Sequence, residues 1–166
     1  MIAPDYFQFF GLAPKLALDL GDLEQRFYRL SRELHPDRFQ RATPAERQRS
    51  LDSSAILNDA YRTLRDPIAR AEYVLKRLGL AADSKQVPAE LLEEVFALNE
   101  ALEEQNAAQL EAGRSRFEAL RAQTDLDLQS LFRQFDAGDP TAPAQIRALL
   151  NRRRYIMNLL ETATHV

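Results

Sequence analysis

The sequence of 166 residues has no cysteine, no tryptophan, only five glycines and only two histidines. Without cysteine, the chain cannot form a disulfide, a thiolate zinc site or a cysteine-ligated cluster. The absence does not identify a redox compartment, because a cytosolic protein can simply lack cysteine. It does exclude every kind of site that needs a thiolate.

Long apolar runs are also missing. No stretch approaches the roughly 20 apolar residues that a membrane-crossing helix needs. The N-terminus lacks a basic segment followed by an apolar one, so no signal peptide is visible. We therefore expect a cytoplasmic protein with no membrane partner.

The residues that are abundant favour helices. Leu, Ala, Glu and Arg are common, 45% of the residues are hydrophobic and 28% are charged, which suits a folded, soluble, all-α protein. The net charge of −3 is unevenly distributed. Residues 25–49 carry seven arginines, whereas residues 90–104 carry six glutamates and no basic residue. We expect the first region to attract acidic partners and the second to attract basic ones, more weakly at high salt.

The tripeptide His35-Pro36-Asp37 lies between two predicted helices. Before it, apolar residues recur every three or four positions, as on one face of a helix over about 20–34: Leu23, Phe27, Leu30 and Leu34. Pro36 disfavours helical geometry at His35, so this helix is expected to end there. After the tripeptide, Thr43-Pro44-Ala45-Glu46 is typical of a capping box and begins a second helix over about 44–64. The two helices form a hairpin whose tip exposes an imidazole and a carboxylate.

Capping and breaking signals divide the chain into two predicted domains. Besides the hairpin, the expected helices cover about 4–10, 67–78, 88–105, 107–136 and the residues after Thr141. The last three are expected to pack as a three-helix bundle. Between the domains, the segment from Gly79 to Pro88 is short, small and polar. We expect the domains at 1–76 and 88–166, with a linker over 77–87.

The first 75 residues resemble a J-domain of the HscB type. The resemblance rests on the tripeptide and on these further motifs: Asp5-Tyr6-Phe7, Gly11-Leu12, Arg26-Phe27, Leu30, Asn58-Asp59-Ala60-Tyr61, Leu64, Asp66-Pro67 and Arg70-Ala71-Glu72-Tyr73. The remainder resembles HscB-type proteins by length and pattern. These proteins are co-chaperones of iron–sulfur cluster assembly, with an N-terminal J-domain and a C-terminal helical domain.

The resemblance implies a chaperone-binding surface around the tripeptide. Arginines recur at intervals of three on the preceding helix and continue into the loop: Arg26, Arg29, Arg32 and Arg38. By resemblance, this strip and His35-Pro36-Asp37 bind the ATPase domain of an HscA-like ATP-dependent chaperone, with Arg26 and Arg29 as the favoured members. The plainer interpretation is that the arginines form an ordinary solvated face and that Pro36 only stops a helix.

An enzymatic or metal-binding interpretation of the tripeptide lacks the residues it needs. His35 could act as a general base oriented by Asp37, but no nucleophile lies beside the pair, and the other histidine is His165, at the C-terminus. A tetrahedral metal site needs three or four ligands, and no second histidine follows at the usual spacing. An isoelectric point near 5.5, without aromatics among the exposed basic residues, argues against nucleic acid. We expect no enzyme activity, cofactor, metal or nucleic-acid partner.

A second candidate surface lies on the predicted helix over about 88–105. Leu92 and Phe96 are about 100° around this helix from the core stripe of Leu91 and Val95. They are either exposed anchors or part of a wider buried arc. By resemblance, this face binds an IscU-like iron–sulfur scaffold through Leu92, Phe96, Glu100 and Glu104, with Tyr155 at its border.

Together these features predict a co-chaperone, not an enzyme. It would stimulate the ATPase of the HscA-like chaperone through the tripeptide and deliver the scaffold to it. The alternative is a general J-protein that delivers unfolded clients to a DnaK-type chaperone. Against that alternative, the Gly/Phe-rich segment and Cys-rich zinc module of many such proteins are missing.

Overall fold

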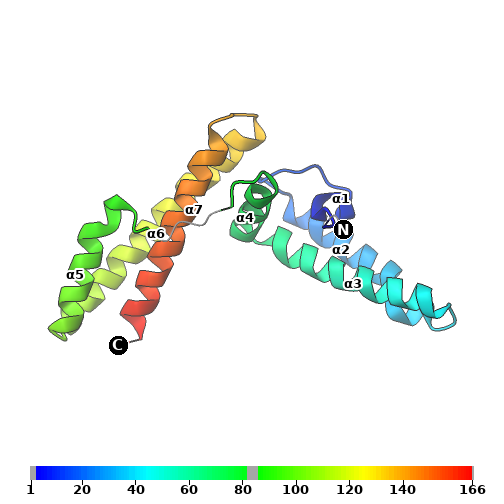
Figure 1. Ribbon diagram of the computed structural model, residues 1–166, viewed down its shortest axis with the longest axis horizontal. Helices are drawn as coiled ribbons and strands as arrows, with labels where there is room; N and C mark the ends of the chain where they lie inside the picture. The colour runs from blue at the N-terminus through cyan, green and yellow to red at the C-terminus, as the bar shows by residue number, and fades with distance from the viewer. Residues whose placement is uncertain (1–2, 82–85, 166) are drawn as a thin grey trace. The chain divides into compact units, whose positions relative to one another are not determined.

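The computed structural model describes residues 3–81 and 86–165, which are helical with no strand among them (Figure 1). This confirms the all-α fold. The chain divides into two compact units, the first ending at Val74 and the second beginning at Leu75. This division falls inside a helix, and residues 82–85 of the expected linker lie outside the described residues. The boundaries predicted at 1–76, 77–87 and 88–166 therefore stay a prediction.

The first unit is built on an antiparallel helical hairpin. Its helices are α1 (Tyr6–Phe10), α2 (Leu20–Leu34), the 3₁₀ turn η1 (Pro36–Phe39), α3 (Pro44–Arg65) and α4 (Pro67–Arg77). Figure 1 shows α2 and α3 running side by side in opposite directions, with α1 against both of them. The turn between α2 and α3 contains the tripeptide His35-Pro36-Asp37.

Local capping sets where these helices begin. The Asp5 carboxylate accepts hydrogen bonds from the backbone N–H groups of Phe7 and Gln8, at 3.0 and 3.2 Å. At the start of α3, the Thr43 backbone N–H donates to the Glu46 carboxylate at 2.8 Å, and the Glu46 N–H donates to the Thr43 hydroxyl at 3.3 Å. The predicted capping box is thereby confirmed. The hydrogen bond from the Thr43 backbone is also the main cause of a lowered pKa at Glu46.

The core of the first unit lies between the hairpin, α1 and α4. Its buried side chains include Phe7, Phe10, Leu16, Leu23, Leu57, Ala60, Leu64, Ala71 and Val74. Helix periodicity would place the apolar Leu51 on the inward face of α3, but Leu51 is exposed and its neighbour Ser50 is buried. The two residues are about 100° apart around α3, and Ser50 faces the end of α2, where its hydroxyl finds a hydrogen-bond acceptor.

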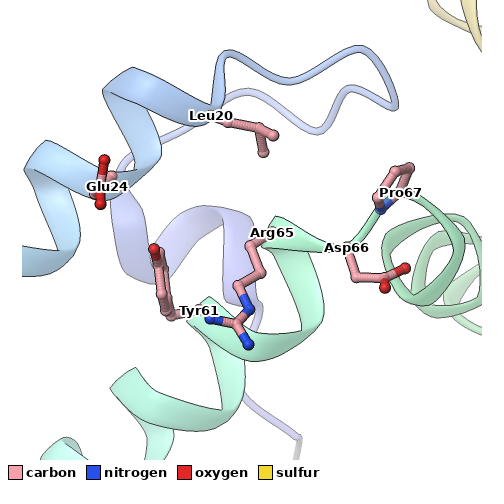
Figure 2. A pocket seen from close by; sticks show the side chains of 6 residues that line it. All are labelled: Leu20, Glu24, Tyr61, Arg65, Asp66 and Pro67. Carbon is pink, nitrogen blue, oxygen red and sulfur yellow. The ribbon is translucent and has the colours of Figure 1, made fainter.

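A shallow hollow lies where α3 passes into α4 (Figure 2). Its lining residues are Leu20, Glu24, Tyr61, Arg65, Asp66 and Pro67. The Arg65 guanidinium lies 5.6 Å from the centroid of the Tyr61 ring, a cation–π distance. The Asp66 carboxylate caps α4 by accepting from the N–H groups of Ile68 and Ala69. None of the predicted site residues lines this hollow.

The second unit is the expected three-helix bundle. It contains the 3₁₀ turn η2 (Ala89–Leu91), α5 (Leu92–Glu103), α6 (Ala107–Asp136) and α7 (Ala142–Thr164). Helices α6 and α7 pack along much of their length, and α5 packs on α6 (Figure 1). The core shared by the three helices is formed by Leu91, Leu98, Phe117, Ile156, Leu159 and Ala163. Within the described ranges, no helix is long and apolar enough to cross a membrane.

The start of α7 is not capped by the side chain of the threonine that precedes it. Thr141 is the residue before the helix, as expected, but its hydroxyl caps no backbone N–H of α7. Instead, the Thr141 backbone N–H and hydroxyl both donate to the Asp139 carboxylate, each at 2.8 Å. These bonds, the backbone one first, lower the pKa of Asp139. The turn before α7 is therefore held by Asp139, with Gly138 in the left-handed conformation at φ 89°.

Candidate protein-binding surfaces

The tripeptide forms a compact, exposed turn. His35 ends α2 with φ −60° and ψ 132°, the extended geometry that a following proline requires. The Asp37 backbone N–H donates to Nδ1 of His35 at 3.2 Å. Because Nδ1 accepts this hydrogen bond, the neutral ring carries its proton on Nε2. Both side chains are exposed, so the turn presents an N–H donor and a carboxylate to solvent.

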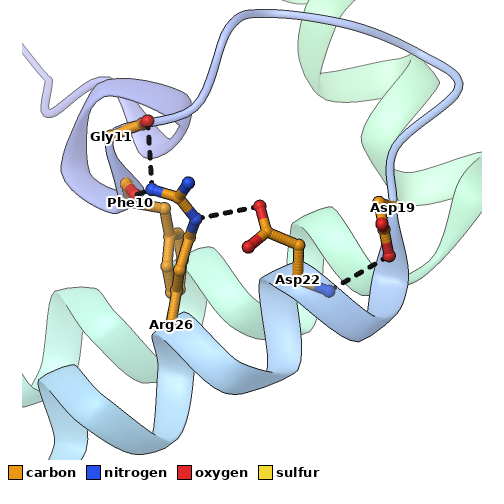
Figure 3. A network of polar contacts seen from close by, with 5 residues as sticks. All are labelled: Phe10, Gly11, Asp19, Asp22 and Arg26. Carbon is orange, nitrogen blue, oxygen red and sulfur yellow. Dashed lines mark hydrogen bonds and ion pairs between the residues drawn. The ribbon is translucent and has the colours of Figure 1, made fainter.

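The arginine strip is only partly as predicted. Arg29, Arg32 and Arg38 are exposed. Arg26 is half-buried, and its Nε donates to the Asp22 carboxylate at 2.9 Å. Its Nη1 donates to the backbone carbonyls of Phe10 and Gly11, at 2.9 and 3.2 Å (Figure 3). The expectation that Arg26 lies on the exposed side of α2 is therefore wrong, and its role in chaperone binding stays a prediction.

The physical reason is the pitch of the helix. Residues three apart are displaced by about 60° around an α-helix, so Arg26, Arg29 and Arg32 do not share one narrow face. Arg26 falls on the flank beside the end of α1. There, carbonyl groups at a helix C-terminus lack helical partners and attract a cation. Arg26 thus ties α1 to α2.

Sequence reasoning missed an aromatic residue on the exposed face of α2. Tyr28 is a large exposed side chain. It lies one turn before Arg32, which in turn lies three residues before His35, so the three side chains follow one side of the helix. The signal was available in the sequence, because Tyr28 falls well away from the apolar line of Leu23 and Phe27. Tyrosine and arginine are residues that often anchor interfaces.

The second candidate surface lies on α5. Leu92 is 42% exposed and Phe96 is 70% exposed, which confirms the expectation of exposed side chains and contradicts the wider buried arc. Glu100 and Glu104 are also exposed. The surface therefore combines an apolar pair with carboxylates on one helix.

One glutamate of α5 belongs to the bundle rather than to this surface. Glu94 is buried, and its carboxylate accepts from Nε and Nη2 of Arg116 on α6, at 2.9 and 2.6 Å. The hydrogen bond from Arg116 lowers the pKa of Glu94 below its usual value. This pair joins α5 to α6 and leaves the exposed carboxylates of α5 for a partner.

Tyr155 is half-buried and packs against the core cluster that contains Leu91 and Ile156. One turn earlier on α7, Nη1 of Arg152 lies 4.0 Å from the Glu90 carboxylate of η2. This part of α7 is therefore beside the start of α5. A place for Tyr155 at the border of the α5 surface stays a prediction.

Neither surface has the features of a metal centre. In residues 3–81 and 86–165, no three His, Cys, Asp or Glu side chains gather where they could hold a metal ion. What the surfaces offer is hydrogen-bonding, charged and apolar groups for contact with other proteins.

Comparisons with known proteins agree with this architecture. Residues 87–164 match the family model of the HSCB C-terminal oligomerisation domain. The solved structure of chaperone HscB from Vibrio cholerae is 30% identical, with 97% of this chain and 96% of that chain covered and a TM-score of 0.71. The chain belongs to the HscB family. Human co-chaperone HscB is also similar, with 27% identity, 99% of this chain and 82% of that chain covered, and a TM-score of 0.76.

Curated HscB relatives match over part of their length. The Co-chaperone protein HscB homolog of Neisseria meningitidis is 41% identical over 81 residues, 49% of each chain. That of Bordetella avium is 37% identical over 99 residues, 57% of this chain and 59% of the relative. The matched segment thus spans about half the length of these relatives, both of which are named co-chaperones.

Proposed function

We propose that this HscB-family protein is a co-chaperone that stimulates the ATPase of an HscA-like chaperone and delivers an IscU-like iron–sulfur scaffold to it. The observation that supports the proposal is that each unit exposes one candidate surface, and that the two candidate surfaces carry opposite charge. The first unit carries the His35-Pro36-Asp37 turn with its arginines. The second carries Leu92 and Phe96 with exposed glutamates.

On the first unit, the turn acts by binding rather than by chemistry. It offers the Nε2 proton of His35, the carboxylate of Asp37 and the guanidinium groups of Arg29, Arg32 and Arg38 to an acidic chaperone surface. Exposed charges of this kind mainly increase the association rate. Stimulation of ATP hydrolysis then requires that the turn bind one state of the chaperone more tightly than the other.

On the second unit, the exposed pair on α5 acts as the anchor. An aromatic and an aliphatic side chain beside carboxylates fit a partner with an apolar pocket and a basic rim. Leu92 and Phe96 supply the apolar contact, and Glu100 and Glu104 supply the charge. The iron–sulfur cluster is cargo on the partner, because this chain has no cysteine to ligate it.

Steady-state ATP hydrolysis by a purified HscA-like chaperone tests the proposal. We expect the chain to raise turnover, and the IscU-like scaffold to raise it further only when the chain is present. A DnaK-type chaperone with an unfolded client is the matched comparison. Equal stimulation of the DnaK-type chaperone, with no effect of the scaffold, would support the general J-protein alternative and overturn the proposal.

A further inference from the structure

The last carbonyl of α2 has an unusual set of partners. In a continuing α-helix, the Leu34 carbonyl would accept from the backbone N–H of Arg38, four residues later. Pro36 ends the helix, and the Arg38 N–H donates instead to the His35 carbonyl at 3.0 Å. The Leu34 carbonyl is thus one of the unpaired groups that a helix end leaves behind.

Two serines of α3 satisfy this carbonyl. The Ser50 hydroxyl donates to the Leu34 oxygen at 2.9 Å, and the Ser54 hydroxyl donates to the same oxygen at 3.1 Å. The serines are one helical turn apart, so both hydroxyls face α2. Ser50 is only 3% exposed, and a carbonyl oxygen has two lone pairs to fill.

These hydrogen bonds act on the peptide plane that leads into the tripeptide. The Leu34 oxygen and the His35 nitrogen belong to one planar peptide group. Holding the oxygen at two points therefore sets the direction in which the chain leaves α2 towards His35. We propose that Ser50 and Ser54 are positioning residues, which orient the His35-Pro36-Asp37 turn for binding to the chaperone.

This inference rests on the proposed function, and it differs from a merely structural role. A small residue at Ser50 would also let α2 and α3 approach closely, and alanine would serve that purpose. Alanine keeps the small volume and removes the donor. The hydroxyls matter for positioning only if their loss changes the turn while the hairpin stays folded.

The test compares Ser50→Ala/Ser54→Ala with Ser53→Ala in the full chain. Ser53 lies on the same helix, is half-buried like Ser54, and its hydroxyl makes no bond to Leu34. We expect the double variant to lose most of its ATPase stimulation, because the turn is displaced, with its helical circular dichroism and cooperative melting retained. Ser54→Thr keeps a hydroxyl and is expected to stimulate like the unaltered chain.

A second measurement is independent of the chaperone. The amide proton and nitrogen resonances of His35 and Arg38 should shift in the double variant and in Ser54→Ala alone, but not in Ser53→Ala. Unchanged resonances at the turn, or stimulation by a folded double variant equal to that of the unaltered chain, would overturn the positioning role.

If the unaltered chain gave no stimulation, the proposed function would fail, and the resonances would still decide the positioning role. If the double variant did not fold, Ser54→Ala and Ser54→Thr would decide by the same two measurements.

Discussion

The two candidate surfaces are built in different ways. The turn of the first unit is held by backbone and side-chain hydrogen bonds at the end of α2 and the start of α3. The surface of the second unit is a helix face, on which Leu92 and Phe96 lie outside the stripe that packs the bundle. The first therefore depends on the path of the backbone, and the second depends only on which side chains α5 leaves uncovered.

This difference implies different responses to mutation. Replacing residues in the turn removes binding groups and costs little core packing. Replacing residues on α5 removes apolar anchors and leaves the backbone of the helix unchanged. In neither case should a loss of partner binding require a loss of folding.

The largest expected effect comes from the tripeptide. Replacing His35, Pro36 and Asp37 by alanine should abolish ATPase stimulation, because the imidazole, the carboxylate and the proline that shapes the turn are removed together. The cost in stability should be limited to turn and cap effects of about 1 kcal/mol each. ATP turnover and a thermal melt of the same sample measure both. Stimulation at the level of the unaltered chain would contradict the role of the turn.

The next effect sharpens the contrast with the second unit. Leu92→Ala/Phe96→Ala should weaken scaffold binding by about 1–3 kcal/mol for each anchor, with only a small fall in melting temperature because Phe96 is 70% exposed and Leu92 is 42% exposed. Titration with the scaffold measures the binding. Leu126→Ala is the matched control, since Leu126 is an exposed leucine on α6. A large fall in melting temperature in the double variant would show instead that the two side chains support the core.

A smaller effect is expected for two arginines of α2, because Arg29 should affect chaperone binding and Arg26 should affect stability. Arg29→Glu should slow association with the chaperone, and the association of the unaltered chain should weaken as salt rises. Arg26→Ala should instead lower the free energy of unfolding by about 1 kcal/mol, because its hydrogen bonds tie α1 to α2. Stopped-flow binding at two ionic strengths and denaturant unfolding measure the two effects. Salt-independent association, unaltered in Arg29→Glu, would leave the arginines as a solvated face.

The smallest expected effect is on how the free energy of unfolding of the three-helix bundle depends on pH. The pKa of Glu94 is lowered in the folded chain by the hydrogen bond from Arg116. Its stabilising contribution is therefore present above the usual glutamate pKa and is lost as pH falls through the folded value. Glu94→Gln should lower the free energy of unfolding at neutral pH by about 1 kcal/mol and flatten its fall at acid pH. If the free energy of unfolding depended on pH in the same way in both chains, the ion pair of Glu94 with Arg116 would not contribute to the stability of the bundle.

The sequence predicted most of the fold because its signals are local. The bounds of α2 and α6 agree with the expected helices, since an N-cap or a breaker lies at each end. Helix periodicity placed Leu92 and Phe96 beside the core stripe, but it left open whether they are exposed or part of a wider buried arc, and the structure shows that they are exposed. Membership of the HscB family was visible in the motifs around the tripeptide.

What the sequence did not predict depends on contacts between distant residues. Arg26 turns away from the strip because it meets the carbonyls of Phe10 and Gly11, 16 and 15 residues earlier. Ser50 is buried in place of Leu51 because its hydroxyl reaches Leu34, 16 residues earlier. The spacing of residues within α3 does not contain the contact between Ser50 and Leu34, so periodicity favours the more hydrophobic Leu51 as the inward residue.

The most direct test of the account is the rise in chaperone ATP turnover that the scaffold adds, measured with Leu92→Ala/Phe96→Ala. If the two surfaces act separately, this variant should stimulate the chaperone like the unaltered chain when the scaffold is absent, and adding the scaffold should raise turnover no further. Loss of the stimulation seen without scaffold, or a full additional rise with it, would contradict the assignment of one partner to each unit.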